Sequence, residues 1–169
     1  MKSLFSSLAV AAAVLISTAT TAASAKADQS QTILSIAEST PELSKLVELV
    51  KRAGLADVLN SAGPLTVFAP TNEAFPNESF LPSGEALKDL LLYHVANGRY
   101  SYAQLASLPT LAGEGEAELR MANGQVNFID ERGGGYLTLD TFTVVTVRDI
   151  EAANGVIHII NHVLKQPGL

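Results

Sequence analysis

The stretch of sequence that decides the fold lies late in the chain and reads Asn154-Gly155-Val156-Ile157-His158-Ile159-Ile160-Asn161-His162-Val163-Leu164. Its valines and isoleucines follow a turn signal, which predicts a strand from Val156 to Leu164. Side chains alternate along a strand, so His158 and His162 would share one face with apolar neighbours, and the other face is apolar as well. A strand that is apolar on both faces belongs in the middle of a sheet.

A second stretch, earlier in the chain, reads Thr66-Val67-Phe68-Ala69-Pro70-Thr71-Asn72-Glu73-Ala74-Phe75. The run from Leu65 to Ala69 is short, apolar, partly β-branched and bounded by two prolines, which predicts another buried strand. Thr71 or Asn72 can cap a short helix that continues to Phe75. Between the two stretches, a Leu-rich helical segment leads into Tyr93-His94.

The order of the remaining patterns predicts an α+β fold. In the first half, apolar residues recur at three- and four-residue steps, which is typical of an amphipathic helix. The clearest of them are Leu43, Leu46, Val47 and Val50. In the second half, Ala117 to Ile129 alternates around Asn123-Gly124, a strong signal for a β-hairpin. Helices followed by strands favour an α+β fold over alternating parallel units.

The first 25 residues have the pattern of a signal peptide. Lys2 gives a positive start, an apolar run extends from Leu4 to Ile16, and Ala23-Ser24-Ala25 offers small residues for cleavage. A membrane anchor is the alternative, but the run is shorter than the roughly 20 residues that span a bilayer. We therefore expect removal of residues 1–25, a flexible N-terminal segment at 26–31 and one domain at 32–167. The product would be secreted, extracellular or periplasmic, with no transmembrane segment.

The composition argues against several classes of function. The chain has no cysteine, so it has no disulfide, no thiol chemistry and no cysteine metal site. Eleven Lys and Arg oppose seventeen Asp and Glu, which gives a net charge of −6 at pH 7. The basic residues are also scattered, whereas a nucleic-acid-binding protein needs a basic face for the phosphates. We expect no nucleic-acid partner.

His158 and His162 have the spacing of a metal site on a helix, but the predicted strand separates them. Four residues of strand span about 13 Å, and zinc–nitrogen bonds are about 2 Å long. We therefore expect no metal and no cofactor. A buried His158 would instead need a hydrogen-bond partner within the fold.

No sequence motif identifies a reaction. The chain has no Gly-x-Ser-x-Gly elbow, no phosphate loop and no dinucleotide fingerprint. We expect a protein that is not an enzyme. One alternative is an exported small-ligand carrier or hydrolase, which predicts a deep pocket lined by convergent acidic groups. Another is an envelope structural protein with no discrete ligand.

Two pairs of residues are candidates for contact with a partner. At Tyr93-His94, an exposed tyrosine would offer apolar area and a hydroxyl. The alternative is a buried tyrosine, with its hydroxyl or the His94 ring tying a loop to the core. At Asp149-Ile150, a charged residue beside an exposed aliphatic side chain suits docking, and the alternative is the end of a strand.

In this order and spacing, the stretches Thr66–Phe75, Tyr93-His94 and Asn154–Leu164 resemble the motifs of the fasciclin domain. The resemblance runs from about Thr32 to Pro167, and Asn72 and Asn161 stand where the family often carries Asp. It implies a fasciclin-like β-wedge of several strands packed with short helices. It also implies an extracellular adhesion or matrix-associated module, generally without enzymatic activity.

The resemblance further implies candidate site residues. In animal members, the tyrosine-histidine region and an Asp-Ile pair have been linked to integrin binding, and these correspond here to Tyr93, His94, Asp149 and Ile150. Integrins are not implied, because the short signal segment, the single domain and the lack of cysteine look bacterial. We therefore expect a secreted binding module for a cell-surface protein, polysaccharide or matrix component.

Overall fold

The computed structural model of the chain describes residues 31–77, 81–108, 116–132, 136–140 and 142–165. The predicted signal peptide at 1–25, and residues 26–30 of the predicted flexible segment, lie outside the described residues. Short helices dominate the first half. They are α1 (Ile33–Ser39), the 3-10 turn η1 (Pro41–Leu43), α2 (Ser44–Arg52), α3 (Ala56–Asn60), the 3-10 turn η2 (Asn72–Ala74), α4 (Glu85–Leu92) and α5 (Tyr102–Ala106).

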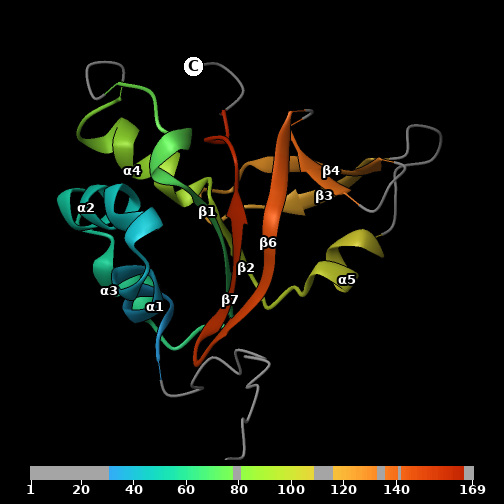
Figure 1. Ribbon diagram of the computed structural model, residues 1–169, viewed down its shortest axis with the longest axis horizontal. Coiled ribbons are helices and arrows are strands. Elements are labelled where there is room, and N and C mark those ends of the chain that lie inside the picture. The colour runs from blue at the N-terminus through green and yellow to red at the C-terminus, as the bar shows by residue number, and fades with distance from the viewer. Residues whose placement is uncertain (1–30, 78–80, 109–115, 133–135, 141, 166–169) are drawn as a thin grey trace, which may run out of the picture.

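Seven strands form one sheet that curls toward a barrel (Figure 1). They are β1 (Leu65–Pro70), β2 (Val95–Asn97), β3 (Glu116–Arg120), β4 (Val126–Arg132), β5 (Tyr136–Leu139), β6 (Thr143–Ala152) and β7 (Gly155–Ile160). Their order is β2-β1-β7-β6-β5-β4-β3, and a bridge between Ala96 and Met121 links the two ends. The predicted α+β class is confirmed, and so is the hairpin around Asn123-Gly124, which joins β3 to β4.

β7 lies between β1, which runs parallel to it, and β6, which runs antiparallel. All six of its residues are buried, so the predicted central strand is confirmed. The predicted end at Leu164 is wrong, because the strand stops at Ile160. There the side-chain oxygen of Asn161 accepts a 2.8 Å hydrogen bond from Val144 N–H, and the chain bends away from the sheet. His162 therefore lies exposed instead of sharing a face with His158.

The contacts of Asn154 and Gly155 explain why the last motif begins with an asparagine and a glycine. The Asn154 side chain donates to Leu59 O at 2.7 Å and accepts from Ile33 N–H at 2.9 Å, so it joins the helices to the sheet. Gly155 pairs with Leu65 on β1. A Cβ atom on Gly155 would collide with the Leu65 carbonyl, so only glycine fits this close approach.

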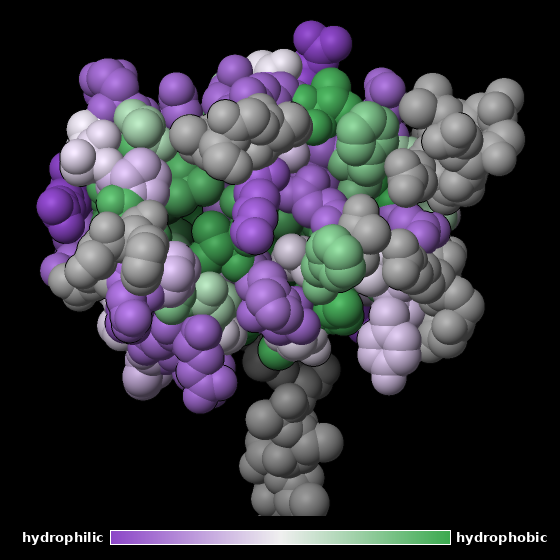
Figure 2. Space-filling model, turned by 90° about the horizontal axis from the view of Figure 1, so that it is seen from above, coloured by the Kyte–Doolittle hydropathy of each residue, from purple (hydrophilic) through white to green (hydrophobic). Residues whose placement is uncertain are grey.

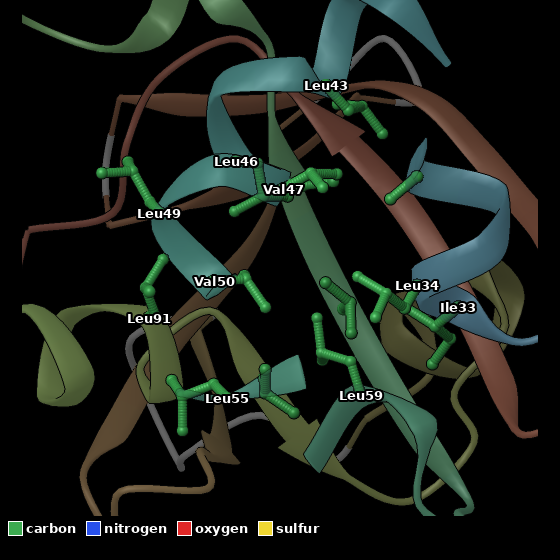
Figure 3. Close-up of a cluster of buried hydrophobic side chains, with 14 of the residues drawn as sticks. Ile33, Leu34, Leu43, Leu46, Val47, Leu49, Val50, Leu55, Leu59 and Leu91 are labelled. Atoms are coloured by element: carbon green, nitrogen blue, oxygen red, sulfur yellow. The ribbon is translucent and has the colours of Figure 1, made fainter. Parts of the chain in front are cut away.

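Two hydrophobic clusters form the core. The first lies between the helices and one face of the sheet, as Figure 3 shows for Leu46, Val50 and Leu59, which point toward the strands. The second fills the barrel, with Phe68, Ile129, Leu139 and Ile160 among its members. Within the described residues, no helix is both long and apolar enough to span a bilayer.

Candidate functional site

His94 lies in the core, where it joins α4 to the segment that follows β7. Its side chain is 2% exposed. Nδ1 lies 2.7 Å from Leu90 O, and Nε2 lies 2.9 Å from Leu164 N–H. A carbonyl can only accept and an N–H can only donate, so the ring is neutral with its proton on Nδ1. Burial lowers the pKa of His94 to about 4, which keeps this neutral form at neutral pH.

Tyr93 is completely buried and turns its hydroxyl toward the hairpin between β5 and β6. The hydroxyl lies 3.3 Å from Oδ1 of Asp140 and 3.4 Å from Val126 O. Burial and the nearby Asp140 carboxylate raise the pKa of Tyr93 well above its usual range. Burial also raises the pKa of Asp140. The fully buried side chain of Asn127 lies beside both groups.

These contacts decide between the two interpretations of Tyr93-His94. Both side chains are inside the protein, and their polar atoms bind segments that are distant in sequence. The interpretation in which the pair ties loops to the core describes what is observed. Neither side chain offers surface to a partner, so any effect on binding would arise through the position of neighbouring segments.

Asp149 lies on the surface, in a bulge of β6. The pairing of β6 with β7 shifts between Val147 and Ile150, which leaves Asp149 outside the regular ladder with φ of 58°. This left-handed conformation is tolerated better by Asp and Asn than by most residues. The carboxylate Oδ1 accepts a 2.7 Å hydrogen bond from Tyr102 N–H, the first residue of α5. Asp149 thereby fixes the bulge to the start of that helix.

His158 supports this bulge from inside the sheet. It is fully buried and stacks on Phe68, with ring centroids 5.7 Å apart. Nδ1 accepts from Asp149 N–H at 3.3 Å, and Nε2 lies 2.9 Å from Tyr100 O. The prediction that His158 is structural and finds hydrogen-bond partners is confirmed. Burial lowers the pKa of His158, which favours the neutral ring that these two bonds require.

Other side chains around the bulge form a partly charged surface. Ile150 is only partly exposed, and it packs against the first hydrophobic cluster, which lies between the helices and the sheet. The guanidinium carbon of Arg148 lies 4.5 Å from the centroid of the Tyr102 ring. Arg99 and Glu151 form an ion pair of 3.7 Å nearby. The geometry thus keeps Asp149 and Ile150 together on β6, with Asp149 exposed and Ile150 partly buried, and places Tyr93 and His94 elsewhere, in the core.

The best-formed cavities in the described part of the chain are small, and two of them have a volume of about 20 Å³ each. That volume accommodates about one water molecule. One is apolar and is lined by residues such as Leu46, Val67 and Leu91. The lining of the other includes Lys45, Glu48 and Arg52. Neither is the deep pocket of convergent acidic groups that a carrier or hydrolase predicts.

The predicted cap at Thr71 or Asn72 is wrong, because η2 has no side-chain cap hydrogen bond and ends at Ala74. Oδ1 of Asn72 instead accepts from Lys45 N–H at 2.9 Å, and Nδ2 of Asn72 donates to Pro41 O at 2.9 Å, so its side chain fixes the start of α2. The sequence patterns did not identify Asp140 and Asn127 around Tyr93. An asparagine beside a turn was the available signal for Asn72, whereas nothing local identifies a distant partner.

Comparisons with known proteins identify the family. The Fasciclin domain family model matches residues 41–167. Protein sll1483 of Synechocystis sp. is 35% identical, over 85% of this chain and 78% of its own length. Uncharacterized protein sll1735 of the same organism is 38% identical, over 78% of this chain and 96% of its own length. Transforming growth factor-beta-induced protein ig-h3 of Sus scrofa is 32% identical over 80% of this chain, which covers 19% of that protein.

A solved structure shows the same fold. It is a FAS1 domain pair from the insect cell adhesion molecule fasciclin I, with a TM-score of 0.66 and 24% identity over 80% of this chain. The chain spans about half of that pair, 51% of its length. The expected fasciclin-like β-wedge packed with short helices is therefore confirmed. By its family match and its sequence relatives, this chain belongs to the fasciclin domain family.

Proposed function

We propose that the chain is an exported adhesion-type binding module, and that the β6 bulge around Asp149 engages a cell-surface or matrix component. Membership in the fasciclin domain family supports an adhesion role, because a structural relative is described as a cell adhesion molecule. The single observation that carries the assignment of the surface is the exposed carboxylate of Asp149 on a bulge with fixed geometry.

The bulge is held in one conformation from two sides. Inside the sheet, His158 accepts a hydrogen bond from Asp149 N–H, and outside it the Asp149 carboxylate binds the start of α5. A surface that is ordered before binding loses less conformational entropy when the partner arrives. The second carboxylate oxygen, the Arg148–Tyr102 stack and the Arg99–Glu151 pair provide charged and polar groups to that partner.

Tyr93, His94 and Ile150 have supporting roles in this proposal. Ile150 anchors the bulge by packing against the helical core, and Tyr93 and His94 hold the barrel together from within. Of the four candidate residues, Asp149 is therefore the one that we expect to touch the partner.

The test compares two substitutions, each of which removes the charge of a side chain and keeps its shape. In Asp149→Asn, the side chain still has an oxygen that can accept from Tyr102 N–H, and asparagine also tolerates positive φ. The substitution removes only the negative charge. Glu42→Gln is the matched control, because Glu42 is an exposed acid on the 3-10 turn η1. The probe is the immobilised surface fraction, proteins and polysaccharides together, of the cells that produce the chain.

We expect Asp149→Asn to weaken binding by about tenfold, as loss of a charged hydrogen bond does. The melting temperature of Asp149→Asn should match that of the unmodified chain. Glu42→Gln should bind the fraction as tightly as the unmodified chain does. Equal binding by the two variants would remove Asp149 from the site. If the immobilised fraction failed to retain the folded, unmodified chain, the adhesion role itself would be contradicted.

A further inference from the structure

The outer face of the second half of the sheet carries large aromatic side chains that are exposed to solvent instead of buried in the core. Phe128 on β4 is 43% exposed, Tyr136 on β5 is 62% exposed, and Phe142 in the connection between β5 and β6 is 80% exposed. We refer to Phe128, Tyr136 and Phe142 as the aromatic face. Large exposed aromatic side chains that gather on one surface are typical of an interaction site.

Strand register places two of these side chains on one face of the sheet. Asp130 pairs with Thr138, so Phe128 and Tyr136, each two residues away from one of them, stand on the same face of the sheet. Asp140 N–H donates to Phe128 O at 3.2 Å, and Phe142 N–H donates to Asp140 O at 2.8 Å, so Asp140 links the backbones of Phe128 and Phe142. Four residues of strand separate Tyr136 from Asp140, a span of about 13 Å.

Nothing in the described part of the chain covers this face with a helix. Leu105 of α5 packs with Ile129 and Leu139, which point to the opposite side of β4 and β5. Figure 1 shows α5 below β3 and β4. Seen from above, the molecule shows green hydrophobic side chains interspersed with purple polar ones (Figure 2).

The area of the aromatic face is too small for a stable dimer. With about 200 Å² for a whole aromatic side chain, the exposed fractions amount to about 400 Å². A stable protein–protein interface buries about 800 Å² on each partner. The face is also the outer side of a sheet, whereas bound peptides commonly use a sheet edge or a groove. Its size and shape suit a ligand that lies across it as a narrow chain.

Charge narrows the chemistry of that ligand. The exposed Glu118 of β3 pairs directly with Phe128, so a carboxylate stands beside an aromatic ring. The whole chain carries a net charge of −6, which repels uronic acids and sulfated sugars. A neutral sugar ring has an apolar C–H face that can pack on an aromatic ring and hydroxyl groups that can donate to a carboxylate.

We infer that the aromatic face binds a neutral polysaccharide chain, with sugar rings packed on Phe128, Tyr136 and Phe142 and their hydroxyls bonded to Glu118. This surface is separate from the β6 bulge around Asp149. The inference therefore does not depend on the function proposed for that bulge, and either can fail without the other.

The test measures binding to soluble polysaccharides by affinity electrophoresis. The neutral probes are dextran, amylose, laminarin and xyloglucan, and the acidic probe is polygalacturonate. The variants are Phe128→Ala, Tyr136→Ala, Phe142→Ala and Glu118→Gln. Val147→Ala is the control, because Val147 is an exposed apolar residue of β6, 45% exposed, outside the aromatic face. Melting temperatures identify any variant that does not fold.

We expect the chain to bind at least one neutral probe and not polygalacturonate. Each aromatic replacement should weaken binding by about three- to tenfold, and Val147→Ala should leave it unchanged. The inference would be overturned if no neutral probe bound, if polygalacturonate bound better, or if the aromatic variants bound as well as the control. It would also be overturned if sedimentation showed a dimer that Phe142→Ala dissociates, because a second copy would then cover the face.

Discussion

The hydroxyl of Tyr93 and the ring of His94 lie in the core, whereas the carboxylate of Asp149 lies on the surface of β6. All three groups bind other parts of the protein, so the difference is not in the number of contacts but in access to water. A buried polar group that loses its partner remains desolvated, while an exposed one can bond to water instead. The consequences of substitution should therefore follow burial, and the predictions below test that order.

The largest effect is expected for His94→Ala. This change leaves Leu90 O and Leu164 N–H without their partner and opens a cavity where the ring was. Together these losses should lower the free energy of unfolding by about 3–5 kcal/mol, measured by urea denaturation. His162→Ala is the matched control, because His162 is exposed, and it should cost about 0.5 kcal/mol or less. Similar costs for the two variants would contradict the buried position of His94.

Acid should weaken the fold through the same residue. The pKa of His94 is about 4 in the folded protein, against 6.5 for an ordinary histidine. Below pH 6.5 the unfolded chain takes up a proton that the folded chain does not, so stability falls as the pH falls from 6.5 to 4. The loss should reach about 3 kcal/mol and change little below pH 4.

Two other buried groups modify this pH dependence. The pKa of His158 is also lowered, so His158 adds to the loss in acid. The pKa of Asp140 is raised, so the folded chain takes up that proton first, which partly offsets the loss. The measurement is urea denaturation at several pH values between 4 and 7. A free energy of unfolding that does not change over this range would mean that the histidines are accessible to solvent.

An intermediate effect is expected for Tyr93→Phe. The substitution keeps the buried ring but removes the hydroxyl that lies near Asp140 and Val126 O. Loss of this buried partner should cost about 1–2 kcal/mol in urea denaturation. Tyr136→Phe removes a hydroxyl from an exposed ring and should cost close to nothing. If Tyr93→Phe were equally neutral, the hydroxyl would have no structural role.

The smallest effect is expected at the surface bulge. Asp149→Ala removes the bond to Tyr102 N–H, an exposed group that can bond to water instead, and puts alanine at a φ of 58°, for a combined cost of about 1 kcal/mol. Asp149→Gly loses the same bond but adopts this φ freely, so it should be the more stable of the two. Thermal denaturation ranks them, and the reverse ranking would place the bulge in a different conformation.

The periodicity of the sequence predicted those strands and turns that depend only on residues close together along the chain. Alternation and turn residues predicted β7 and the β3–β4 hairpin, because each depends on neighbours along the chain. The same patterns say nothing about which strands pair. The parallel contact between β1 and β7 joins Leu65 to Gly155, and it is revealed in the sequence only by the glycine that the close approach requires.

Like the pairing of β1 with β7, the burial of Tyr93 and His94 cannot be predicted from local sequence patterns. The groups that bind these side chains come from Val126, Asp140 and Leu164, far away in the sequence. A tyrosine and a histidine after an amphipathic helix are compatible with burial, but the sequence does not name their partners. Asp149 shows the same limit, since its bond to α5 depends on a bulge that the alternation of β6 does not predict.

The most direct test of the contrast between core and surface is an NMR titration of the ring nitrogens of His94. It requires neither a substitution nor a known partner. The account predicts a neutral ring with its proton on Nδ1 that persists down to about pH 4. A ring that gains its second proton near pH 6.5 and exchanges freely with water would contradict it.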